Sequence, residues 1–132
     1  MRILETALYA ENLDETAAFY RDVLGLDEFA RAPGRHVFFR VEDGVLLLFR
    51  PAATRVPPAP GRPGVPPHGA DGPGHLCFAA TGPEIDGWIA HLAAHRVAIE
   101  NLVDWPQGGR SIYFRDPAGN SVEFAEPGIW GL

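Results

Sequence analysis

Two stretches of the chain show the same succession of hydrophobic and polar positions. In the first, a strand-like alternation is followed by apolar residues at helical spacing and by three more strand-like runs, over 3–10, 13–24, 26–32, 36–42 and 45–50. The second repeats this order over 74–80, a helix beginning near 81–84, and strands over 97–104, 111–115 and 121–126. Each stretch therefore predicts the order strand–helix–strand–strand–strand.

The residues between these elements suit helix ends and turns. Asn12 and Glu15 have the spacing of a capping box, and Gly25 is placed to end the first helix. Pro33-Gly34 and Asp43-Gly44 are typical of turns between strands. The turn chemistry thus agrees with the periodicity.

The two stretches also align with each other. Glu5 falls opposite His75, and Leu48 falls opposite Glu123. A fixed internal offset is typical of a duplicated supersecondary unit, so we expect an α+β fold of two βαβββ modules in one domain. The expected boundaries are about 1–51 for module 1, about 52–73 for a linker, about 74–127 for module 2, and 128–132 for a C-terminal tail.

The segment from Pro51 to Pro73 is rich in proline and glycine, and we expect no regular structure in it. Loops of this length are usually functional or act as linkers. This segment could be both.

Composition narrows the class of protein. The net charge of -6 and the lack of a Lys/Arg cluster argue against nucleic acid or an anionic membrane as a partner. Cys77 is the only cysteine, which rules out an intrachain disulfide and suits a reducing compartment. A charge at Glu5 comes too early for a signal peptide, and no apolar run approaches membrane length. We expect a cytoplasmic protein.

The alternation of side chains along strands predicts which of them share a face. Glu5, His75 and Glu123 should all point away from the helix-covered core, and each can bind a divalent cation. The same alternation places further side chains on this face, namely His36, Phe38, Leu46, Leu48, Ser111 and Tyr113. An apolar and aromatic surface with a few polar groups is typical of a small-molecule site. Alternatively, His75 is structural, and the two glutamates are solvated or paired with arginines such as Arg2 or Arg110.

Three segments resemble the vicinal oxygen chelate superfamily, which includes glyoxalase I, bleomycin and fosfomycin resistance proteins, extradiol dioxygenases and methylmalonyl-CoA epimerase. They are 13–26, 74–79 and 113–124. The resemblance implies that the sheets of two βαβββ modules curl around a concave metal-binding cup. It also implies metal ligands on the first strand of each module and on a last strand, which in this chain are Glu5, His75 and Glu123.

The chain departs from the family pattern at two points. The family's first-strand ligand is commonly His or Gln, whereas this chain has Glu5, and glyoxalase I has a carboxylate where this chain has Leu48. Three ligands with open positions resemble the dioxygenase or fosfomycin-thiol-transferase arrangement more closely. Extradiol iron sites, however, normally have two His and one carboxylate.

The resemblance implies a metal-dependent enzyme of the glyoxalase/bleomycin resistance/dioxygenase type. A small substrate with two neighbouring oxygens would chelate a divalent Fe, Mn, Zn, Ni, Co or Mg ion, which acts as a Lewis acid or as a dioxygen site. Dioxygenase, lyase and isomerase activities all remain open. The alternatives are a metal-free protein that sequesters a small molecule such as an antibiotic, and a fosfomycin-type thiol transferase.

Further residues are candidates for the site. His68 could be a general base, a substrate contact, a fourth ligand or an exposed loop residue, and Tyr113 is the second candidate for catalysis. Candidates for substrate binding are His36, Phe38, Leu48, Trp105, Arg110, Ser111 and Trp130. We interpret His91 and His95 as solvent-facing, and Cys77 as a small packing residue.

The proline-rich linker favours an extended course, and little chain remains to cover an exposed sheet edge. We therefore expect a two-fold homodimer that binds a small-molecule substrate. In this dimer Glu5 of one chain would face His75 and Glu123 of the other.

Overall fold

The computed structural model describes residues 1–132 and divides into two compact units, Met1–Pro73 and Gly74–Leu132. We describe each unit by itself. Each contains one four-stranded mixed sheet with the same strand order, which confirms the predicted α+β fold of two βαβββ modules.

In unit 1 the sheet order is β1-β4-β3-β2. The pair β1–β4 is parallel, and the other neighbours are antiparallel. The elements are β1 (Glu5–Tyr9), α1 (Leu13–Ala18), the π-helical turn η1 (Phe19–Val23), β2 (Asp27–Ala32), β3 (His36–Val41), β4 (Gly44–Phe49) and α2 (Pro51–Thr54).

The first helix begins and ends where the sequence predicts. The Asn12 side chain accepts the backbone N–H of Glu15 at 3.3 Å, as an N-cap should. Gly25 has a φ of 73°. This left-handed conformation lets Leu26 N–H reach back to Tyr20 O at 3.0 Å.

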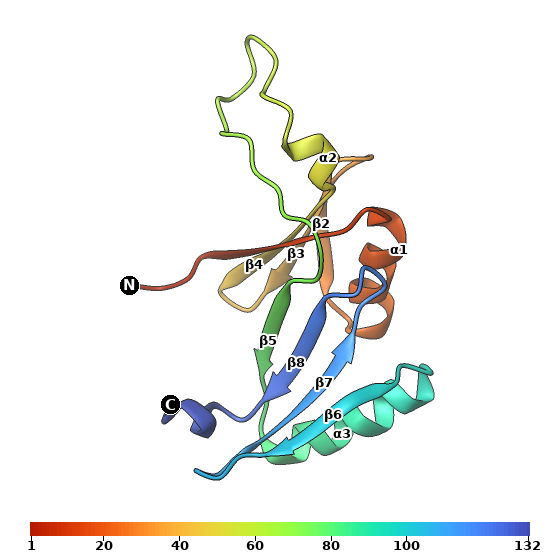
Figure 1. Cartoon of the computed structure of the whole chain (residues 1–132), viewed down its shortest axis with the longest axis vertical. Helices are drawn as coiled ribbons and strands as arrows, with labels where there is room; N and C mark the ends of the chain where they lie inside the picture. Colours follow the sequence, from red (N-terminus) through yellow and green to blue (C-terminus); the bar gives the residue numbers. More distant parts are fainter. The chain divides into compact units, whose positions relative to one another are not determined.

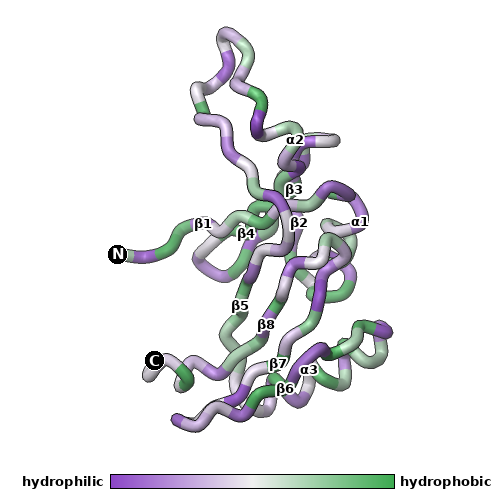
Figure 2. Tube along the Cα trace, in the orientation of Figure 1, coloured by the Kyte–Doolittle hydropathy of each residue, from purple (hydrophilic) through white to green (hydrophobic).

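The core of unit 1 lies between this helix and one face of the sheet. Leu48 pairs with Leu8 of β1 and Val37 of β3, so these side chains share a face. All three are buried, and Tyr20 is buried as well. Figure 2 shows β4 in the green of hydrophobic residues.

The prediction that Leu46 and Leu48 face the candidate site was therefore wrong. Arg40 pairs with Val45, five positions on, whereas its counterpart Arg115 pairs with Ser121, six positions on. This extra residue shifts the alignment of the last strands by one, and a shift of one residue moves side chains to the other face. The structural counterpart of Glu123 is Leu47, not Leu48.

The sequence predicts no regular structure from Pro51 to Pro73, and the first four residues of this segment differ from that prediction. Pro51–Thr54 forms one helical turn, with Pro51 at a first-turn position that needs no N–H donor. From Arg55 to Gly74 the chain forms no helix or strand, as its composition predicts.

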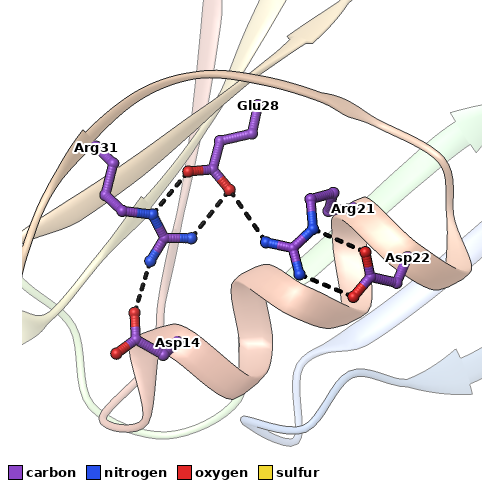
Figure 3. A network of polar contacts seen from close by, with 5 residues as sticks. All are labelled: Asp14, Arg21, Asp22, Glu28 and Arg31. Atoms are coloured by element: carbon purple, nitrogen blue, oxygen red, sulfur yellow. Dashed lines mark hydrogen bonds and ion pairs between the residues drawn. The ribbon is translucent and has the colours of Figure 1, made fainter.

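A network of charged side chains joins the first helix to β2 (Figure 3). Arg31 donates to both oxygens of Glu28, at 2.6 and 2.9 Å, and to Asp14 at 2.6 Å. Arg21 lies 3.5 Å from Glu28 and makes a two-point contact with Asp22 at 2.7 and 2.8 Å. Hydrogen bonding from Arg31, with the charges of both arginines, lowers the pKa of Glu28.

Replacing Arg31 by methionine is expected to lower the free energy of unfolding at pH 7 by about 1 kcal/mol or less. The pKa of Glu28 lies below its ordinary value of 4.5 in the folded chain, so its contribution is complete above that value. It is lost as the pH falls through the lower folded pKa. Urea unfolding across this range should show the two proteins converging in acid, and a difference that persists below that pKa would contradict the assignment.

Unit 2 repeats the topology with the sheet order β5-β8-β7-β6 and a parallel β5–β8 pair (Figure 1). Its elements are β5 (His75–Ala79), α3 (Gly82–Ala94), β6 (Ile99–Asp104), β7 (Arg110–Arg115), β8 (Ser121–Ala125) and the 3-10 turn η2 (Pro127–Trp130). None of the helices in the chain is long and apolar enough to cross a bilayer.

Two local hydrogen-bonded motifs help to position the elements of unit 2. Thr81 and Glu84 form a capping box at the start of α3. Asn120 ends the β7–β8 turn, where it bonds to Asp116 through its backbone N–H at 2.8 Å and accepts from Gly74 N–H at 2.7 Å. This turn therefore holds the residue that precedes His75.

Candidate metal centre

His75 and Glu123 lie on the neighbouring strands β5 and β8. Cys77 pairs directly with Glu123 in the parallel register, and His75 pairs with Ser121. The alternation of the strands therefore puts His75 and Glu123 on the same face, as the sequence predicts. His75 Nε2 lies 3.2 Å from Glu123 Oε2.

The other ring nitrogen of His75 decides what can lie between these two atoms. Nδ1 is 3.1 Å from the backbone oxygen of Ser121, which can only accept a hydrogen bond. With the proton of the neutral ring on Nδ1, Nε2 presents a lone pair to a carboxylate oxygen. A proton or a metal ion must lie between them, and an N–H donated to a carbonyl is typical of histidines that bind metals.

The second oxygen of Glu123 points to the same requirement. Glu123 is only 5% exposed, and its Oε1 is buried without a hydrogen-bond partner. A buried carboxylate oxygen without a partner is costly, and an ion or an ordered water molecule can satisfy it. An imidazole next to this carboxylate is a donor set that fits a divalent transition metal.

Neutral donors surround the pair on the same face. Partial burial raises the pKa of the Cys77 thiol to about 12, and the charge of Glu123 adds to this effect. Burial, followed by interaction with Glu123, also raises the pKa of Tyr113. Both groups therefore keep their protons at neutral pH. The Tyr113 ring stacks with His75 at a centroid distance of 6.4 Å, and Trp105 Nε1 donates to Ser111 Oγ at 2.9 Å.

Within either unit, no group of three or more His, Cys, Asp and Glu side chains is placed to hold a metal ion. His75 and Glu123 form a pair in unit 2, and Glu5 is an exposed residue at the start of β1 in unit 1. The role of Glu5 as a third ligand stays a prediction.

Unit 1 presents a face of aromatic rings. His36 stacks on Phe38 at 4.1 Å, and Phe49 meets these two rings edge-on at 6.1 and 5.5 Å. Burial, with a smaller effect of the Arg35 charge, lowers the pKa of His36, so this ring is neutral at pH 7. The surface suits a flat apolar ligand.

His68 is held on this aromatic face. It is the only residue from Arg55 to His75 that is not exposed. Its Nδ1 is 2.8 Å from the Tyr9 hydroxyl, its ring meets Phe49 edge-on at 4.7 Å, and its backbone N–H donates to Thr54 O at 3.1 Å. Sequence analysis missed Tyr9 and Phe49 as partners, although the alternation of β1 does put Tyr9 on the same face as Glu5.

Replacing Tyr9 by phenylalanine keeps the ring and removes the hydrogen bond to His68. We expect the free energy of unfolding to fall by about 1 kcal/mol and cleavage in 55–74 to accelerate several-fold, because this residue holds an otherwise exposed segment. Limited proteolysis measures the second effect. Tyr113→Phe, a tyrosine of unit 2, is the matched control and should leave cleavage in 55–74 unchanged; equal acceleration in both variants would contradict the assignment.

The structure also places four other residues that the sequence analysis interpreted. Leu48 is fully buried on the core face, so it cannot contact a ligand as predicted. Arg110 alternates with Ser111 and binds Gly82 O and Asp86 at 2.6 and 2.8 Å, which ties it to α3 on the face opposite the candidate metal pair. Trp130 is 79% exposed on η2. Cys77 reaches solvent rather than packing in the core.

Paired βαβββ modules with a histidine and a glutamate side by side on one sheet face define the class of protein to which the chain is compared. The model of the Glyoxalase/Bleomycin resistance protein/Dioxygenase superfamily matches residues 2–124. The chain therefore belongs to this superfamily, which confirms the resemblance found in the sequence.

Solved structures agree with this assignment. A lactoylglutathione lyase from Agrobacterium tumefaciens is 46% identical, with a TM-score of 0.94 over 99% of this chain and 97% of that chain. A glyoxalase/bleomycin resistance protein/dioxygenase from Nocardioides is 25% identical, with a TM-score of 0.73 over 96% of this chain and 83% of that chain.

A mutant of the fosfomycin resistance protein FosX from Listeria monocytogenes, complexed with Mn(II) and a dihydroxypropylphosphonic acid, shares the fold at 18% identity and a TM-score of 0.67 over 96% of this chain and 91% of that chain. No curated protein matches the chain.

Proposed function

We propose that this protein is a metal-dependent enzyme that acts on a small organic substrate with two neighbouring oxygen atoms. His75 and Glu123 would bind the metal in unit 2, and Glu5 would supply the third protein ligand. The observation that carries the proposal is the pair itself. Nε2 faces a carboxylate at 3.2 Å, and the other oxygen of that carboxylate is buried without a partner.

A divalent Mn, Fe, Co, Ni, Zn or Mg ion would supply Lewis-acid chemistry at this point, polarising a bound oxygen. The protein residues would orient the substrate and move protons. Tyr113 lies directly opposite Glu123 in the sheet and is placed to donate a hydrogen bond to a substrate oxygen. His68, held by Tyr9, is the candidate acid or base.

The lactoylglutathione lyase among the similar structures makes a lyase or isomerase reaction the first to test. Unit 1 has Leu47 where unit 2 has Glu123, so the duplicated position offers no carboxylate as a fourth protein ligand. Dioxygenase chemistry on catechols and thiol transfer to fosfomycin are therefore the next reactions to test.

The deciding experiment is calorimetric titration of metal-depleted, untagged protein with these six ions. It is followed by assays on the methylglyoxal–glutathione adduct, catechol, and fosfomycin with a thiol. His75→Ala should weaken binding at this site by about 100-fold or more and abolish turnover, since it removes one of few ligands. His36→Ala, a histidine of the other sheet, is the matched control for metal binding. If the His75→Ala protein bound as many metal ions as the wild type, the proposal would be overturned.

A second function, metal-free sequestration of a small molecule, is favoured by the aromatic face of unit 1. Its rings His36, Phe38, Phe49 and His68 lie within 4.1 to 6.1 Å of their neighbours. A sequestering protein would bind an aromatic ligand equally well after removal of metal and would turn over none of the three substrates.

We also propose that the working form is a homodimer, in which Glu5 of one chain completes the metal site formed by His75 and Glu123 of the other. In that form, metal affinity and stability would both fall on dilution.

A further inference from the structure

Two histidines lie one turn apart at the C-terminal end of α3. His91 is in the last turn of the helix and His95 caps it, and both are exposed. Residues four positions apart lie on the same side of a helix. Here the ring centroids are 4.2 Å apart with an interplanar angle of 36°. Neither residue belongs to the candidate metal centre on the sheet.

The His95 ring is already held as a metal ligand would be. Its Nδ1 lies 2.9 Å from the backbone oxygen of His91, which can only accept, so in the neutral ring Nδ1 carries the proton. The lone pair is then on Nε2, and this division of the two nitrogens is typical of histidines that bind metals. The partial negative charge at a helix C-terminus also favours a cation there.

We propose that His91 and His95 together bind one divalent transition-metal ion of the Cu, Ni or Zn type on the surface of α3. Imidazole nitrogens suit these metals, and a pair of imidazoles without a carboxylate is a poor site for Mg or Ca, which prefer oxygen ligands. The two imidazoles provide a chelate, and water molecules complete the coordination.

The neighbours of the pair define the rest of the site. Glu84 lies two turns earlier, but its Oε2 already accepts from the backbone N–H and the hydroxyl of Thr81, at 2.7 and 2.8 Å. The capping box therefore holds Glu84 at the start of the helix, and the proposed chelate does not use it. The Trp88 ring meets His91 edge-on at 5.2 Å and stacks on Phe124 at 4.4 Å, so it is a fixed fluorescent reporter beside the site.

The test uses untagged His75→Ala protein, in which the candidate centre on the sheet is removed. Titration with Cu(II) should quench Trp88 fluorescence and broaden the ring signals of His91 and His95 in NMR spectra. Adding His95→Ala should weaken Cu(II) binding by about 100-fold, because the second imidazole then no longer acts at a high effective concentration. Trp88→Phe should remove most of the quenching and leave the affinity measured by calorimetry unchanged.

A rescue experiment tests the spacing. In the protein that lacks His75 and His95, Gly87→His would restore a pair four positions apart with His91. A side chain at Gly87 meets nothing within 4 Å. Ala90→His adds the same side chain at an exposed position adjacent to His91, where it points in another direction. Gly87→His should recover affinity and Ala90→His should not. Equal recovery, or no loss on His95→Ala, would show that surface histidines bind Cu(II) singly and would overturn the proposal.

Discussion

Replacing Glu123 by leucine is expected to stabilise the metal-free protein and to abolish metal binding at the candidate centre. The chain contains its own precedent, since Leu47 occupies the equivalent position in unit 1 and is buried there. In unit 2 the same place holds a carboxylate with one oxygen unsatisfied. Removing such a group should raise the free energy of unfolding by about 1–3 kcal/mol. A gain of stability with a loss of binding is typical of residues kept for function.

Urea unfolding of metal-depleted protein measures the stability, and titration with Mn(II) measures the binding. Ser121→Ala is a suitable control, because Ser121 lies on the same face of β8 while its backbone oxygen, the acceptor from His75, is retained. It should change neither quantity by much. If Glu123→Leu destabilised the metal-free chain or kept its Mn(II) affinity, the carboxylate would have a structural role instead.

The fold could be predicted from sequence because local signals agreed at every level. Alternation, helical spacing, the cap at Asn12 and the glycine stop at Gly25 all indicate the same βαβββ order. Parity within strands also sufficed to put His75 and Glu123 on one face, because both strands are regular and their ends are marked by turns.

Two features could not be predicted from sequence. The face of β4 depends on the relative lengths of two turns, and one residue in the β7–β8 turn moved the counterpart of Glu123 from Leu48 to Leu47. The contact between Tyr9 and His68 joins residues that are separated by six elements and by a segment without periodicity. Only tertiary packing determines such a contact.

Mixing two inactive variants is expected to restore activity if the metal site is shared between chains. In such a dimer, each site takes Glu5 from one chain and His75 with Glu123 from the other. A heterodimer of Glu5→Ala and Glu123→Leu chains then concentrates both defects in one site and leaves the other site intact. With random pairing, half of the dimers are mixed and each has one of two sites, so roughly one quarter of wild-type activity should return.

The readouts are turnover and the number of tightly bound Mn(II) ions after the two chains are unfolded, mixed and refolded together. Mixing Glu123→Leu with His75→Ala is the matched negative control, because these two residues come from the same unit and every site in the mixed dimer keeps one defect. Activity only in the first mixture would support the shared site, since only there do the defects segregate. Absence of activity in both mixtures, with dimers present by sedimentation, would instead require each chain to complete its own metal site, and dilution should then leave metal affinity unchanged.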